Sequence, residues 1–184
     1  MSILLWSLIG VIALAIIILI YFYNRFAVLI NRIDNSLSQI DVQLKRRADL
    51  IPNLLETVKG YAKHEKGIMA DVTKARKALV GAADLEGKVK ANDALESALK
   101  SVFALAENYP ALKANENFLE LQRELSATED KIAYSRQYYN DSILTYNNLC
   151  KTFPGNFFAK MYGRVERAYL KIAPAEKEVV KVEF

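Results

Sequence analysis

Two side chains in this sequence, His64 and Cys150, are of types that could support nucleophilic catalysis or metal binding. Each is the only residue of its kind, so a metal site would have to be completed by carboxylates, and no internal disulfide can form. His64 and Glu65 match the start of a zinc-protease helix motif, but its second histidine is replaced by Ile68. The seven glycines form no phosphate-binding loop. We therefore expect no enzyme activity, no cofactor and no metal, with His64 at the surface and Cys150 packed at a helix end.

Charged side chains give a clearer candidate for binding. The densest polar group comprises Arg46, Arg47, Asp49, Asn53 and Lys59. Two interpretations stay open. In one, the two arginines cap the last carbonyls of one helix while Asp49 caps the next. In the other, Arg46, Arg47 and Lys59 face a partner. Nucleic acid is not the expected partner, because the net charge is only +4 and basic residues alternate with acidic ones.

Aromatic side chains form the second candidate, since ten tyrosines are many for 184 residues. Tyr139 and Tyr146 fall on an apolar stripe and are expected in the core. Exposed aromatic residues usually mark an interface. We therefore expect self-association through the aromatic residues that no apolar stripe includes, namely Tyr134, Tyr138, Phe157, Phe158 and Tyr162.

The elements that position these residues begin with a membrane anchor. The run ILLWSLIGVIALAIIILIYFY, from Ile3 to Tyr23, has no charge and is long enough to cross a bilayer. Trp6, Tyr21 and Tyr23 suit the two membrane interfaces, and membrane lipid is the first expected partner. No basic region precedes the run and no cleavage site follows it, which favours an anchor over a signal peptide.

Basic residues set the expected orientation, because they accumulate on the cytoplasmic side of a span. Positive charge follows the run, at Arg25, Arg32, Lys45, Arg46 and Arg47. We therefore expect the N-terminus outside and the remaining domain in the cytoplasm.

Downstream of the anchor, apolar residues recur every three or four positions, which predicts long helices. The expected helices run from the anchor to about Arg47, from Pro52 to Leu79, from Asn92 as an N-cap to Ala106, and from Asn115 to Cys150 on a coiled-coil-like stripe. A kinked, continuous helix through Pro52 is the alternative to a break there. These stripes can be buried only against each other, so we expect an all-α chain with an antiparallel four-helix bundle after the transmembrane helix. The expected domains are residues 1–23 (anchor), 24–163 (bundle) and 164–184 (tail).

Two stretches resemble the LemA family, a bacterial family with one N-terminal transmembrane segment. They are QLKRRADLIPNLLETVKGYAKHE, residues 43–65, and NYPALKANENFLELQRELSATEDKIAYSRQYYN, residues 108–140, and the resemblance spans about residues 22–163. It implies a helical bundle without established enzyme activity, in the bacterial inner membrane. Family members are often encoded near membrane proteases, so the resemblance implies a self-assembling scaffold or adaptor in membrane-protein quality control, with a membrane metalloprotease or another envelope protein as partner. A membrane-anchored sensor is the alternative, and a hydrolase using His64 is the least favoured.

Overall fold

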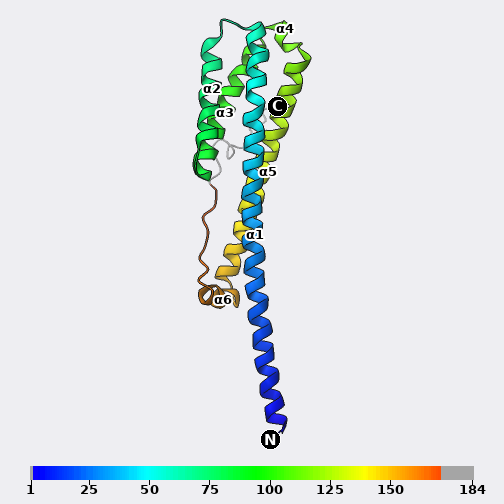
Figure 1. Ribbon diagram of the computed structural model, residues 1–184, viewed down its shortest axis with the longest axis vertical. Helices are drawn as coiled ribbons and strands as arrows, with labels where there is room; N and C mark the ends of the chain where they lie inside the picture. Colours follow the sequence, from blue (N-terminus) through cyan, green and yellow to red (C-terminus); the bar gives the residue numbers. More distant parts are fainter. Residues whose placement is uncertain (1, 171–184) are drawn as a thin grey trace, which may run out of the picture. The chain divides into compact units, whose positions relative to one another are not determined.

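The computed structural model describes residues 2–170, which are mostly helical (Figure 1). The all-α architecture expected from the sequence is confirmed. The helices are α1 (Ser2–Tyr61), α2 (Lys66–Gly81), α3 (Leu85–Ala106), α4 (Pro110–Lys113), α5 (Glu116–Lys151) and α6 (Gly155–Met161). The chain divides into two compact units. Residues 1–37 and 136–184 make the first unit and residues 38–135 the second, so α1 and α5 contribute to both.

The N-terminal part of α1 is apolar and uncovered. Residues 3–23 are all exposed except half-buried Phe22. By length and composition, this part of α1 can cross a membrane. A core helix of a soluble protein would have such apolar side chains buried, whereas here they are exposed to the surroundings of the protein. The helix is therefore consistent with a single-pass anchor.

The expected helix break between Arg47 and Pro52 is wrong, because α1 continues through Pro52 to Tyr61. Asp49, expected as an N-cap, lies inside α1 for the same reason. A proline inside a helix leaves the carbonyl four residues earlier without its partner. Here that carbonyl belongs to Ala48, and it accepts a 2.8 Å hydrogen bond from Nε of Arg76 on α2. A side chain from another helix thus replaces the missing backbone donor.

The second unit is a four-helix bundle, as expected from the sequence, but the single helix expected from Pro52 to Leu79 is wrong. That stretch is divided by a turn after Tyr61, so its first part belongs to α1 and its second part is α2. The long segments of the bundle, α1 from residue 38, α2, α3 and α5 to residue 135, run alternately up and down, with the single turn of α4 leading into α5 (Figure 1). Each segment buries one apolar stripe, as the periodicity predicted. The most deeply buried members of these stripes are Ile40, Ile51, Leu54, Val58, Val72, Leu95, Leu99, Val102, Phe118, Leu125 and Ile132.

Two N-caps set where helices of the second unit begin. The helix expected from Asn115 begins one residue later, at Glu116, and Asn115 is its N-cap, with Oδ1 accepting from the backbone N–H of Phe118 at 3.0 Å. The start of α3 was expected at Asn92 and this is wrong. The cap is Asp84, whose Oδ1 accepts from the N–H of Gly87 at 2.6 Å, and Asn92 is buried two turns inside the helix.

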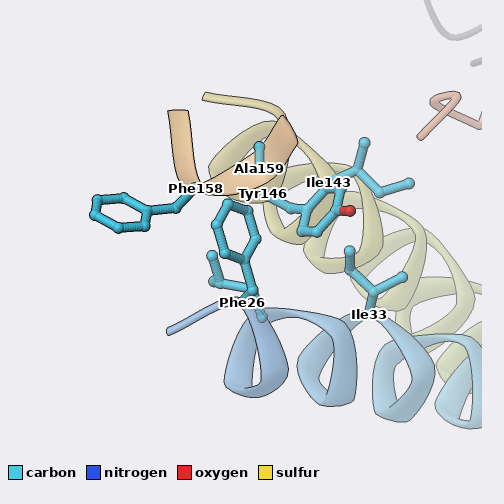
Figure 2. Packing of buried hydrophobic residues seen from close by; sticks show 7 residues of the cluster. Phe26, Ile33, Ile143, Tyr146, Phe158 and Ala159 are labelled. Atoms are coloured by element: carbon cyan, nitrogen blue, oxygen red, sulfur yellow. The ribbon is translucent and has the colours of Figure 1, made fainter. Parts of the chain in front are cut away.

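The first unit has its own apolar core, built by α1, α5 and α6 (Figure 2). Phe26 and Ile33 of α1 face Ile143 and Tyr146 of α5, while Phe158 of α6 closes the end of the cluster. The rings of Phe26 and Tyr146 meet edge to face, with centroids 6.0 Å apart. Of the two tyrosines expected in the core, Tyr146 is 2% exposed, whereas Tyr139 is half-buried against the same cluster.

Gly155 allows α6 to fold back closely after α5. A Cβ atom at this position would lie 2.2 Å from the carbonyl oxygen of Leu149. Any other residue would therefore force the turn open, and with it the packing of Phe158 and Ala159.

Beyond α6, two asparagines hold an extended segment along α5. Asn147 donates to the carbonyl of Arg167 at 2.8 Å and accepts from its N–H at 2.9 Å. Asn140 makes the same pair of bonds with Leu170, at 3.1 and 2.9 Å. The start of the expected tail is therefore fixed by four hydrogen bonds to side-chain amides. The part of the expected tail from residue 171 onward lies outside the described residues.

Candidate functional site

A groove on the second unit is lined by lysines. It has a volume of about 480 Å³ and is formed by one face of α2 together with Lys59 at the end of α1. Its lining contains four ammonium groups, an apolar floor and no carboxylate: Lys59, Lys66, Met69, Ala70, Thr73, Lys74 and Lys77. Within the described part of the chain, none of these lysines forms an ion pair. The groove therefore offers positive charge that the fold does not neutralise.

Acidic residues close in sequence to the groove are directed elsewhere. Glu65, which precedes Lys66, accepts a 3.1 Å hydrogen bond from the hydroxyl of Tyr109. Asp71 lines a separate hollow between α2 and α3, which Lys74 also lines. Neither carboxylate lines the groove itself.

Arg47, a candidate for partner binding, is instead inside the bundle and 3% exposed. Its guanidinium forms an ion pair with Glu129 of α5 and donates to Oδ1 of Asn92 of α3 at 2.9 Å. Burial lowers the pKa of Arg47, while the charges of Glu96 and Asp93 raise it. Three helices are thus linked by one charged side chain.

The role of Arg47 is neither of the two left open by the sequence, since it lies in mid-helix and cannot cap a helix end. A buried ion pair contributes more to fixing how helices align than to net stability. Two further atoms in this cluster, Nε of Arg47 and Nδ2 of Asn92, are buried without a hydrogen-bond partner among the described residues. Arg46, the next residue, is exposed.

The sequence placed Asn92 at a helix N-cap and assigned Glu129 no role, although both residues leave a signal of burial. Glu129 lies four residues after Leu125 and three before Ile132, so it occupies a core position of the α5 stripe. Asn92 precedes Leu95 by three residues in the same way. A polar residue in phase with an apolar stripe predicts a buried partner, and Arg47 provides it.

The aromatic candidates separate into exposed and packed residues. Tyr134 is 69% exposed and Phe157 is 63% exposed, whereas Tyr138 is half-buried. Phe158 is buried and stacks on Phe22 of α1, with ring centroids 4.3 Å apart. Only part of the set is therefore free to contact another molecule.

The aromatic residues of the expected anchor lie on open surface. Trp6 near one end, and Tyr21 and Tyr23 at the other, are 70%, 60% and 53% exposed. Tyr23 also meets Tyr162 edge to face, with centroids 5.7 Å apart, and the Tyr162 hydroxyl donates to the carbonyl of Leu19 at 2.8 Å. The chain after α5 therefore returns to the end of the apolar run.

Neither of the two residues with catalytic chemistry, His64 and Cys150, is among the residues that line the groove. His64 is exposed in the turn between α1 and α2. Cys150 is half-buried at the end of α5, where burial raises the pKa of its thiol, a hydrogen bond with Tyr146 lowers it, and Glu166 raises it. Over residues 2–170, no three His, Cys, Asp or Glu side chains are placed to share a metal ion.

Comparison with known proteins identifies relatives for most of the chain. The family model described as "LemA family" matches residues 36–184, which begins later than the resemblance noted above and extends through the tail. "Magnetosome protein MamQ" of Magnetospirillum gryphiswaldense is 25% identical over 83% of this chain and 66% of its own length. "Protein LemA" of Metamycoplasma hominis is 28% identical over 71% of this chain and 60% of its own length. The chain thus spans less than two thirds of either relative.

Proposed function

Since the chain belongs to the LemA family, we propose that it is a non-catalytic, self-associating adaptor, anchored in the bacterial inner membrane, that gathers other envelope proteins for membrane-protein quality control. A membrane metalloprotease is the partner suggested by the family resemblance. Two features support this proposal: the uncovered apolar part of α1 for anchoring and the lysine groove for recruitment. The basic residues after Tyr23 favour an outside N-terminus and a cytoplasmic bundle.

The groove is the observation that carries the proposal. Four ammonium groups around Met69 and Ala70 fit a protein segment with carboxylates flanking apolar side chains. The carboxylates would supply long-range attraction and orientation, while the apolar floor would supply contact area. We therefore take an acidic, partly apolar segment of another envelope protein as the partner.

Charge reversal inside and outside the groove tests recruitment. The groove variant is Lys66→Glu with Lys74→Glu, and the control is Lys90→Glu with Lys100→Glu, which changes the net charge equally. Both control lysines are exposed and make only i,i+4 surface pairs, worth about 0.3–0.5 kcal/mol each. Crosslinking in native membranes, followed by mass spectrometry, compares the captured proteins.

The expected result is that the groove variant loses partners that the control retains, and that the lost partners present acidic segments. Capture by the parent chain should also weaken as salt rises, because exposed charges are screened. An unchanged set of partners in the groove variant would refute recruitment through these lysines.

A ligand sensor is the second candidate, supported by a hollow of about 350 Å³ in the second unit. Charged residues from α1, α2 and α3 line it, among them Asp41, Asp49, Arg76 and Lys88. Val80→Trp would fill the mouth of this hollow. The substitution should alter the output of a sensor and leave the partner capture of an adaptor unchanged.

The hydrolase alternative depends on His64 alone. His64→Ala should abolish the cellular function of a hydrolase and leave that of an adaptor intact.

A further inference from the structure

The surface around α6 exposes apolar side chains that its own core does not use. Phe153 is 87% exposed, Phe157 63% and Met161 48%, although Phe158 and Ala159 between them are buried. Phe157 and Met161 are four residues apart, so they share one face of the helix. Helix α6 thus buries one apolar face and leaves another open.

This open face lies beside the end of the apolar run in α1. Phe158 stacks on Phe22, and the ring of Phe157 meets Phe158 edge to face with centroids 5.4 Å apart. Figure 2 shows Phe158 beyond Phe26, on the side away from Ile33. The exposed ring of Phe157 therefore sits near the level at which the uncharged segment ends.

The contact between the end of α6 and α1 reaches into the apolar run of α1. The Tyr162 hydroxyl reaches the carbonyl of Leu19, four residues before Tyr23. Four residues of helix correspond to about 6 Å. Apolar faces of helices that lie on membranes are buried by about 5–10 Å. Lys160, exposed next to this face, is of the charge type that anionic lipid headgroups attract.

We propose that the open face of α6, formed by Phe157 and Met161, inserts together with Phe153, which precedes the helix, into the headgroup region of the membrane that α1 crosses. The lipid surface is the occupant because the face is continuous with the membrane-spanning surface of α1. The inference rests on the anchoring part of the proposed function and is independent of the lysine groove. The first unit then contacts the membrane at two places.

Tryptophan fluorescence tests this arrangement in the full chain reconstituted into liposomes. The parent chain has one tryptophan, Trp6, which reports anchoring itself. Trp6→Phe with Phe157→Trp places the probe on α6, and Trp6→Phe with Met161→Trp provides a second probe on the same face. Trp6→Phe with Leu144→Trp is the control.

Leu144 is a matched control because it is 47% exposed in the same unit. Its neighbour Ile143 packs against Ile33, ten residues beyond Tyr23, or about 15 Å along α1. Lipids brominated near the glycerol backbone should quench the α6 probes at least about twofold more than the control, with blue-shifted emission. The control should emit as in water.

Three outcomes would overturn the inference, and each points to a different part of it. Quenching of Trp6 without quenching of either α6 probe removes the lipid contact and leaves the anchor. Blue-shifted but unquenched α6 probes whose emission depends on protein density assign the face to a second copy of the chain. Absence of quenching at Trp6 removes the anchor and the lipid contact together.

Discussion

We predict that the hydrogen bond from Arg76 to the carbonyl of Ala48 stabilises the fold because Pro52 leaves that carbonyl without a backbone donor. The contribution of Arg76 to the free energy of unfolding should therefore depend on the residue at position 52. Arg76→Met keeps most of the aliphatic chain and removes the donor. Pro52→Ala restores a backbone N–H that can bond to the same carbonyl within α1. If the two donors substitute for each other, the cost of Arg76→Met must depend on which residue stands at position 52.

The expected magnitudes follow from the geometry. A hydrogen bond with a charged donor contributes about 1.5–3 kcal/mol, and half-buried Arg76 at 2.8 Å belongs at the lower end. We expect Arg76→Met to lower the free energy of unfolding by about 1.5 kcal/mol in the parent chain. With Pro52→Ala, where the carbonyl has a helical partner, the same change should cost about 0.5 kcal/mol or less. The coupling energy is then about 1 kcal/mol.

Urea unfolding of the full-length chain in mild detergent, followed by circular dichroism, measures all four proteins of this cycle. The apolar part of α1 is expected to stay helical in the micelle, so the change in signal reports the helices outside it. Equal urea dependence in the four proteins would show that the change lies in stability rather than in compactness.

Equal costs of Arg76→Met in both backgrounds would refute the reasoning, since independent sites are additive to within about 0.3–0.5 kcal/mol. A gain of about 3 kcal/mol from Pro52→Ala alone would also count against it. Such a gain is expected only where the carbonyl before the proline is left without a partner.

Three further predictions concern other parts of the fold. Arg47→Ala should cost about 3 kcal/mol because it leaves Glu129 and a buried amide unpaired, whereas Arg47→Met should recover about half of this in urea unfolding; equal losses would contradict the argument. Cys150 should be alkylated more slowly in the folded than in the unfolded chain, with its midpoint at higher pH, because burial raises the thiol pKa. Because the pKa of the Cys150 thiol is higher in the folded chain, the contribution of this thiol to stability is complete below the unfolded pKa, about 8.5, and is lost as pH rises through the folded pKa. An alkylation midpoint unchanged on folding would contradict this. In mild detergent the chain should run well above a 20.8 kDa monomer plus micelle, and Tyr134→Ala or Tyr138→Ala should reduce its size by light scattering; a monomer at every concentration would exclude self-association.

The features that sequence could predict are those with a strong periodic signal. The uncharged run from Ile3 to Tyr23 predicted the helical start of α1, and the stripes ending at Leu79, Ala106 and Cys150 predicted where α2, α3 and α5 end. The start of the last long helix was predicted to within one residue, at Asn115, which caps α5. Errors of a residue or two at such ends do not change the packing.

The continuity of α1 through Pro52 could not be predicted, because its cause is far away in sequence. Proline locally favours a helix end, and the residue that reverses this preference, Arg76, belongs to another helix. The position of Arg47 has a similar origin. Its burial depends on Asn92 and Glu129, which approach only when three helices have packed.

For the aromatic residues after α5, the sequence predicted which residues lie outside the bundle but not where they pack. Sequence indicated that Phe157, Phe158 and Tyr162 lie outside the bundle stripe, and from this we expected self-association. It could not show that α6 folds back beside Leu19 and Phe22, because that placement depends on the close turn at Gly155. The level of these rings along α1, rather than their exposure alone, is the basis for proposing lipid as their contact.

The asparagine pairs on α5 imply a strict rule about where the chain can tolerate added residues. Asn140 and Asn147 are seven residues apart, about 10.5 Å of helix, and their partners Leu170 and Arg167 are three extended residues apart, about 10 Å. The length of seven helical residues therefore matches the length of three extended residues, and it would not match two or four. An extra residue between 167 and 170 would break one amide pair, whereas an extra residue at exposed Val165 would shift neither. Length variation among natural homologues should therefore fall before residue 167 and be absent from 167 to 170.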